Sequence, residues 1–198
     1  MEKTIAIFDF DGTLTKKDSF KDFLVYTFGI AKFYQGILEN IFPLTGYACG
    51  LITNHKAKEK LFQSFFAGWT GECFQEICRT YSLKKIDGIL RAEAKDRMKW
   101  HKSQAHRLVI VSASLVDWLT PWAIKNGFHD VIATEPEIKK GVLTGRFSTP
   151  NCHGQEKKRR FLEKYPDRER YTLYVYGDSN GDKELLKMAD NPFFRCFR

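Results

Sequence analysis

TIAIFDFDGTLT, residues 4–15, is the stretch that decides the fold of this chain. Its apolar run over 5–8 is too short for a helix, and its unbroken hydrophobicity is typical of a strand buried on both faces of a parallel sheet. The run ends in two carboxylates, Asp9 and Asp11, which a Gly-Thr turn follows. Because ligands of open α/β sheets bind beyond the carboxyl ends of the strands, the two acids indicate chemistry rather than packing.

Strands and helices alternate through the second half of the chain. Apolar runs over 108–111 and 171–176 predict two more buried strands, which end at Ser112 and at the stretch Gly177-Asp178-Ser179. Two shorter strands are expected at 131–133 and 193–197, and a hairpin at 137–148. Three helices are expected at 115–126, 155–165 and 183–189. This alternation predicts an α/β fold, a Rossmann-like parallel sheet flanked by helices and joined by right-handed crossovers.

The segment between the first strand and the second is predicted to be helical. Helical patterns lie over 55–66 and 72–81, and Asp18 or Ser19 is expected to cap an earlier helix that ends near Thr27. We therefore expect an all-helical cap inserted between the first two core strands. The predicted division gives the core residues 1–15 and 88–198 and the cap residues 16–87.

Part of this predicted cap is almost free of charge. Only Lys32 and Glu39 carry fixed charge between Phe23 and His55. The uncharged run is short and is broken by a proline and two glycines, so it does not predict a transmembrane helix. Two interpretations stay open: a packed helical lobe, or an apolar surface that admits an amphiphilic substrate or rests on a membrane.

Composition bounds the partners and the compartment. The net charge of +8 favours anionic partners, namely phosphorylated metabolites, acidic lipid surfaces or nucleic acid. The sequence has no recognition-helix pattern, zinc spacing or base-stacking motif, which argues against nucleic acid. The five cysteines are an odd number without a Cys-x-x-Cys pair, and the first apolar run is too short for a signal peptide. We therefore expect reduced thiols in a cytoplasmic protein, with membrane association as the alternative.

Four motifs along the chain resemble, in order, the signatures of the haloacid dehalogenase superfamily of phosphohydrolases. They are Asp9-x-Asp11-Gly12-Thr13, a hydrophobic strand ending at Ser112, a lysine at Lys157, and Gly177-Asp178-Ser179-x-x-Asp182. The resemblance extends over essentially the whole chain, and it implies an aspartate-based phosphatase with an α/β core.

The helical insertion and the stretch from Asn151 to Lys157 are similar to the phosphoserine-phosphatase-like group, subfamily IB. That similarity favours Lys157 over Lys158 as the lysine that binds phosphate. The sequence departs from true phosphoserine phosphatases in carrying Ser112-Ala113-Ser114 where they usually have Ser-Gly-Gly, and it has no clear Glu and Arg pair in the cap. It is closer to the subfamily members that include phosphatidylglycerophosphatase C-type enzymes, whose caps are likewise apolar.

The two acids of the first motif have separate expected roles. Asp9, at the strand end, is the expected nucleophile, because a carboxylate can attack phosphorus and form an aspartyl-phosphate. Asp11 points the same way from an extended chain and is expected to act as general acid and base. Ser112, the backbone near Ala113 and Lys157 are expected to bind the phosphoryl oxygens, because phosphoryl transfer depends on charge stabilisation.

Clustered carboxylates with hard oxygen ligands predict a Mg²⁺ cofactor. We expect Asp9 and Asp178 to bind it through their side chains, with the backbone carbonyl of Asp11 as a third ligand by resemblance. Asp182 is expected to support the site from outside or to ligate directly.

The function that follows is a Mg²⁺-dependent phosphomonoester hydrolase, on an amphiphilic or lipid-linked phosphate approached from an anionic membrane. Two alternatives stay open. One is a phosphatase for a small metabolite such as phosphoserine, and the other is a phosphotransferase or mutase that uses the same aspartyl-phosphate.

Overall fold

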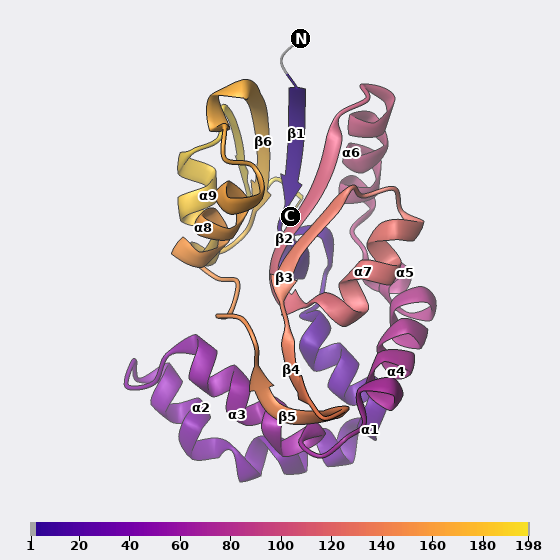
Figure 1. Cartoon of the computed structure of the whole chain (residues 1–198), viewed down its shortest axis with the longest axis vertical. Helices are drawn as coiled ribbons and strands as arrows, with labels where there is room; N and C mark the ends of the chain where they lie inside the picture. The colour runs from indigo at the N-terminus through magenta and orange to yellow at the C-terminus, as the bar shows by residue number, and fades with distance from the viewer. Residues whose placement is uncertain (1–2, 198) are drawn as a thin grey trace.

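A five-stranded parallel sheet forms the centre of the computed structural model (Figure 1), which describes residues 3–197 and, of positions 47 and 48, the backbone alone. The strands lie in the order β3-β2-β1-β6-β7, and all neighbours run parallel. Their bounds are β1 (Lys3–Phe8), β2 (Arg107–Leu115), β3 (Asp130–Thr134), β6 (Tyr171–Gly177) and β7 (Asn191–Phe194). The predicted α/β class is confirmed. Since β1 is central, the strand order reverses beside it, at the place where such sheets bind ligands.

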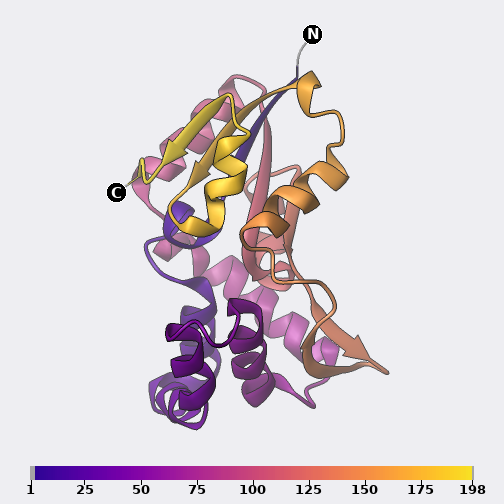
Figure 2. The same ribbon diagram turned by 90° about the vertical axis from the view of Figure 1, so that its left-hand side faces the viewer.

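Helices cover both faces of the sheet (Figures 1 and 2). Successive side chains of the central strands point into two different packed layers. Ile5 and Ile7 pack with Phe161 and Leu185 on the face covered by α8 (Gln155–Lys164) and α9 (Lys183–Lys187). Phe8 and its neighbours pack on the face covered by α6 (Ala92–Ser103) and α7 (Val116–Lys125). Burial on both faces explains why these strands are apolar throughout.

Among the described residues, five helices precede α6 between β1 and β2, and they extend to the end of the molecule opposite the N-terminus (Figure 1). They are α1 (Ser19–Glu39), α2 (Ile41–Ala48), α3 (Asn54–Phe66), α4 (Gly71–Lys84) and α5 (Ile86–Ile89). The chain enters and leaves this helical region side by side, where Thr15 bridges Leu90. A hairpin of β4 (Pro136–Lys139) and β5 (Val142–Phe147) packs against α3 from the other half of the chain.

Two elements are longer than the sequence predicts. Asp18 caps α1 by accepting the Lys21 N–H at 3.0 Å, but the helix continues past Thr27 to Glu39, with a change of direction at Gly29 (φ +79°). Strand β2 continues past Ser112, with a register shift against β3 before Leu115. Within residues 3–197, no helix is both long and apolar enough to cross a membrane.

Candidate active site

Asp9 directly follows β1, and its carboxylate is buried at the carboxyl edge of the sheet. Its backbone N–H donates to the carbonyl of Tyr176 at 2.9 Å, which fixes the strand end against β6. Its side-chain oxygens accept hydrogen bonds from Lys157 Nζ at 2.5 Å and from Thr13 Oγ1 at 3.2 Å. Burial raises the pKa of Asp9 to about 7, and the Lys157 ammonium offsets only part of that effect.

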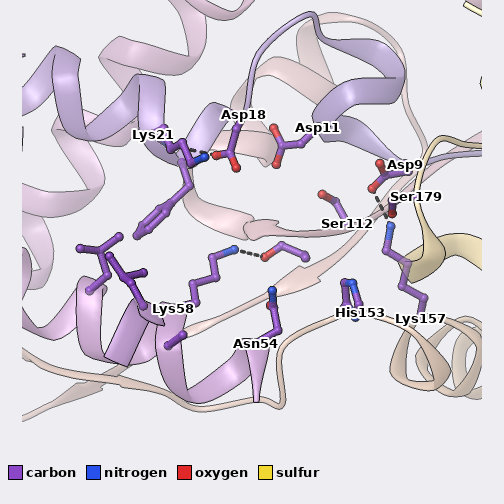
Figure 3. Close-up of a pocket in the computed structure, with 15 residues that line it drawn as sticks. Asp9, Asp11, Asp18, Lys21, Asn54, Lys58, Ser112, His153, Lys157 and Ser179 are labelled. Carbon is purple, nitrogen blue, oxygen red and sulfur yellow. Dashed lines mark hydrogen bonds and ion pairs between the residues drawn. The ribbon is translucent and has the colours of Figure 1, made fainter. Parts of the chain in front are cut away.

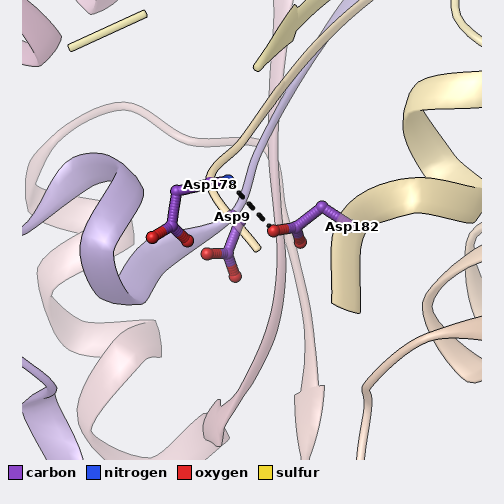
Figure 4. Close-up of side chains that lie close together, drawn as sticks. All are labelled: Asp9, Asp178 and Asp182. Atoms are coloured by element: carbon purple, nitrogen blue, oxygen red, sulfur yellow. Dashed lines mark hydrogen bonds between the residues drawn. The ribbon is translucent and has the colours of Figure 1, made fainter. Parts of the chain in front are cut away.

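Two more carboxylates lie beside Asp9 (Figure 4). Asp178 follows β6 and Asp182 lies one turn later, and the three side chains each offer an oxygen within 4.8 Å of the others. Both oxygens of Asp182 accept hydrogen bonds from the protein. Oδ1 accepts from Lys157 Nζ. Oδ2 accepts from the Asp178 backbone N–H and from the backbone N–H and hydroxyl of Ser179.

This buried set of oxygens fits a hard divalent cation. The four hydrogen bonds that Asp182 accepts occupy both of its oxygens and suit it to supporting the cluster from outside. The chemistry of the donor set therefore agrees with the expected Mg²⁺ site.

Lys157 is the cation built into this cluster. It lies in the first turn of α8, is 2 % exposed, and bridges Asp9 and Asp182 with Nζ–oxygen distances of 2.5 and 2.6 Å. Burial alone would lower the pKa of Lys157, but the two carboxylates raise it above its usual value, so the side chain stays charged. Lys158, the alternative left open by the sequence, is partly exposed and does not line the cavity described below.

The Gly-Thr turn of the first motif closes around Asp178. Gly12 has a φ of +80°, and a Cβ atom there would lie 2.4 Å from an oxygen of Asp178. The Thr13 hydroxyl lies 3.2 Å from Asp9 Oδ2 and 3.5 Å from Asp178 Oδ1. Glycine is required by this close approach and by the left-handed backbone.

Asp11 lies two residues beyond Asp9 and faces the same cavity. Its Oδ1 accepts the backbone N–H of Ser19 at 2.7 Å, and its Oδ2 accepts the hydroxyl of Ser114. Burial, followed by the negative charge of Asp18, raises the pKa of Asp11. A carboxyl group with a raised pKa can hold a proton closer to neutral pH, as a general acid must.

A cavity of about 490 Å³ opens beside Asp9 and Asp11, between the sheet edge and the helical region (Figure 3). Ser112 and Ala113 line its floor from β2, and Lys157 lines the end next to Asp9. The residues assigned to phosphate binding from the sequence therefore lie around one space with the two acids. Asp178 and Asp182 are not among the residues that line this cavity, but they lie beside Asp9 in the carboxylate cluster.

Side chains of the helical region also line the cavity, and the sequence did not indicate them. Lys58 on α3 reaches across it, donates to the carbonyl of Ala113 at 2.5 Å and lies 5.2 Å from the Phe20 ring. Burial lowers the pKa of Lys58. The remaining lining residues on that side are polar at Asp18, Lys21 and Asn54 and apolar at Leu44, Ala57 and Leu61.

The match to a family model decides the classification. The model of the haloacid dehalogenase-like hydrolases matches residues 6–187. The chain belongs to that family. It is a hydrolase of the haloacid dehalogenase superfamily, and the matched segment includes all four motifs.

Relatives of known sequence include one named as a probable phosphatase. The chain is 29% identical to protein CicA of Caulobacter vibrioides over 100% of its own length and 88% of that protein. It is 27% identical to "probable phosphatase Rv3661" of Mycobacterium tuberculosis, over 93% of this chain and 66% of that one.

Among solved structures, a Bordetella pertussis protein of unknown function has a TM-score of 0.82 and 25% identity, with 97% and 89% of the two chains covered. A substrate-bound phosphoserine phosphatase has a TM-score of 0.65 and 16% identity, with 98% and 86% covered, which shows a shared fold.

Proposed function

We propose that this hydrolase is a Mg²⁺-dependent phosphomonoesterase that works through an aspartyl-phosphate on Asp9. The observation that carries the proposal is the buried group of Asp9, Lys157, Asp178 and Asp182, which meets the cavity beside Asp11 and Ser112. The residues that we propose as nucleophile, proton donor and charge-stabilising groups lie around one space, which supports phosphoryl transfer.

The reaction has two displacements. Asp9 attacks phosphorus, the bond to the ester oxygen breaks, and Asp11 gives its proton to the leaving alcohol. Asp11 then takes a proton from water, the water oxygen attacks the same phosphorus, and inorganic phosphate leaves with Asp9 restored. Lys157, the Ser112 hydroxyl and the backbone near Ala113 hold the phosphoryl oxygens in both steps. Mg²⁺ held by Asp9, Asp178 and the Asp11 carbonyl would offset the combined negative charge of acids and phosphate.

The first experiment is phosphate release from 4-nitrophenyl phosphate with and without Mg²⁺, by the parent and by Asp9→Asn. We expect Mg²⁺-dependent turnover by the parent and a loss of at least about 1,000-fold in the variant, because the nucleophile is absent. If the parent does not cleave 4-nitrophenyl phosphate, Mg²⁺-dependent binding of beryllium fluoride to Asp9 tests the site instead. Turnover that survives in Asp9→Asn would contradict the mechanism.

We further propose that the substrate is amphiphilic, and that the cap meets it at an anionic membrane surface. Ile30, Tyr34 and Leu38 form an exposed stripe along α1, four residues apart. Phe42 in α2 and Leu51 in the loop between α2 and α3 are each 84 % exposed. Large apolar side chains gathered on one surface are typical of interaction sites. The net charge of +8 favours an anionic surface as the partner.

Vesicle sedimentation tests this proposal. The parent should pellet with vesicles that contain phosphatidylglycerol and not with pure phosphatidylcholine, and Phe42→Ser/Leu51→Ser should stay in solution. Ile124→Ser is the matched control, since Ile124 is 71 % exposed on α7, outside the predicted cap. The proposal of a membrane-binding surface would be contradicted if both variants bound the vesicles equally. It would also be contradicted if the parent were a dimer and the double variant a monomer.

A small polar phosphate is the second candidate substrate. The polar residues Asp18, Lys21, Asn54 and Lys58 line the same cavity, where they can meet charged groups of a metabolite. A panel of soluble phosphates beside lipid phosphates separates the two candidates. Alcohol acceptors added to the same assay would give new phosphoesters if the enzyme were a phosphotransferase or mutase.

A further inference from the structure

We propose that Ser114 is a positioning residue for Asp11, the last link of a buried hydrogen-bond chain that begins at Trp118 and passes through Ser19. The proposal rests on the proposed function, in which Asp11 carries the proton to and from the reacting oxygen. It assigns a role to the part of β2 that continues beyond Ser112.

The chain joins three elements that are distant in sequence. The indole Nε1 of Trp118, on α7, lies 3.2 Å from the hydroxyl of Ser19, at the start of α1. The hydroxyls of Ser19 and Ser114 lie 2.9 Å apart, and the Ser114 hydroxyl contacts Asp11 Oδ2. Ser19, Ser114 and Trp118 are all 0 % exposed, so water does not compete for these bonds.

When Asp11 is ionised, the chemistry of the two ends fixes the direction of every bond in the chain. An indole nitrogen can only donate, and an ionised carboxylate can only accept. Each serine hydroxyl has one proton, so Ser19 accepts from Trp118 and donates to Ser114, and Ser114 donates to Asp11. No other arrangement satisfies all three bonds when Asp11 is ionised, and such an ordered chain polarises its members toward the carboxylate.

Ser19 also holds the other side of the same carboxylate. Its backbone N–H donates to Asp11 Oδ1 at 2.7 Å, so the two oxygens of Asp11 are fixed by donors from α1 and β2. Each oxygen keeps a second lone pair, and Asp11 lines the cavity. The carboxylate is thereby prevented from rotating away from the reacting oxygen, and proton transfer depends strongly on such geometry.

Ser114→Ala tests this role against Ser114→Thr, which keeps the hydroxyl. The readout is kcat and KM for a series of aryl and alkyl phosphates whose leaving groups differ in basicity. We expect Ser114→Ala to lower kcat about tenfold or more for the most basic leaving groups, which need the proton most, and to change 4-nitrophenyl phosphate little. KM should stay near the parent value, and Ser114→Thr should restore most of kcat.

Ser82→Ala is the matched control. Ser82 is also 0 % exposed, and it donates to the Trp118 carbonyl at 2.6 Å, outside the chain. It should reproduce any general loss of stability without the leaving-group dependence. A loss in Ser114→Ala that is equal for all leaving groups, or one that Ser82→Ala shares, would overturn the proposal.

A crystal structure of Ser114→Ala decides the question without an activity assay. We expect the Asp11 carboxylate to rotate or to occupy two positions, whereas an unchanged Asp11 would overturn the proposal. If the parent itself cleaves no phosphomonoester, the proposed function fails, and this structural comparison still tests whether Ser114 positions Asp11.

Discussion

At the scale of single residues, Lys157 has a structural task besides the catalytic one that we propose for it. It is the buried partner of both Asp9 and Asp182, and removing it leaves two carboxylates buried without their cation. We predict that Lys157→Met lowers kcat/KM at least about 100-fold, and that it costs about 3–5 kcal/mol of unfolding free energy, as the breaking of a buried ion pair does. A phosphatase assay and urea unfolding measure the two effects.

The neighbouring Lys158 is the control for this prediction. It is partly exposed and lies on the same helix, so Lys158→Met changes the same charge and volume without touching the acids. We expect activity and stability within about 0.5 kcal/mol of the parent, as for surface substitutions. The reverse result would exchange the two lysines in the proposed mechanism.

The positions of some site residues follow from a strand end, whereas Lys157, on α8, was indicated by the family resemblance. Asp9 and Asp178 end adjacent parallel strands, so their proximity follows from the alternation of elements. Lys58 was missed because its contact is the backbone carbonyl of Ala113, 55 residues away, and no residue pattern encodes such a contact. The roles assigned to the site residues stay predictions until the variants are measured.

At the scale of elements, the turn after β1 offers a comparison between two glycines. Gly12 and Gly29 have nearly equal φ values, +80° and +79°, but a Cβ at Gly12 would meet Asp178 at 2.4 Å, whereas at Gly29 it would meet nothing within 4 Å. We predict that each alanine variant loses about 1–3 kcal/mol of stability, because backbone with a positive φ is strained for alanine. Only Gly12→Ala should also lose most of its activity.

Thermal unfolding and the phosphatase assay, run on both alanine variants, separate backbone strain from displacement of Asp178. An active Gly12→Ala would mean that Asp178 can shift without consequence, which is incompatible with its proposed role as a Mg²⁺ ligand. Loss of activity in Gly29→Ala would instead assign a catalytic role to the bend in α1.

Element ends were harder to predict than element types. Gly29 was compatible with a helix end, yet α1 resumes after it because Phe28, Phe33 and Ile37 pack against the core on both sides of the bend. Likewise, the polar residues after Val111 suggested that β2 stops, whereas Ser114 is buried by its contact with Ser19. Tertiary partners, which local pattern does not show, decided both ends.

At the scale of the whole molecule, the sheet could be predicted and the placement of the helical region on it could not. Unbroken apolar runs predict buried parallel strands. A strand was expected from the sequence for each of the five strands of the sheet. The position of α3 depends on its packing against the β4–β5 hairpin, whose strands lie more than 65 residues later. That packing brings Lys58 over the cavity, where it lines the side formed by the helical region.

The far side of the sheet gives the molecule a pH-dependent stability that is separate from the active site. His101 on α6 is 0 % exposed, with its ring nitrogens 2.8 Å from His106 Nδ1 and 2.9 Å from the Tyr176 hydroxyl. Burial, with His106 and Arg97 adding to it, lowers the pKa of His101 to about 3. The unfolded chain takes up this proton near pH 6.5 and the folded chain does not.

Stability contributed by His101 is therefore full above about pH 6.5 and is lost progressively as the pH falls toward 3. Asp9 works in the opposite direction, because its raised pKa lets the folded state hold a proton that the unfolded state releases between about pH 4 and 7. The difference in unfolding free energy between the parent and a His101→Gln variant does not contain the Asp9 contribution, because both proteins share it. We predict that the parent is the more stable at pH 7.5, and that its advantage in unfolding free energy shrinks steadily between pH 6.5 and 4. Urea unfolding across that range measures it, and an advantage that stays constant would mean that His101 is protonated in the folded protein.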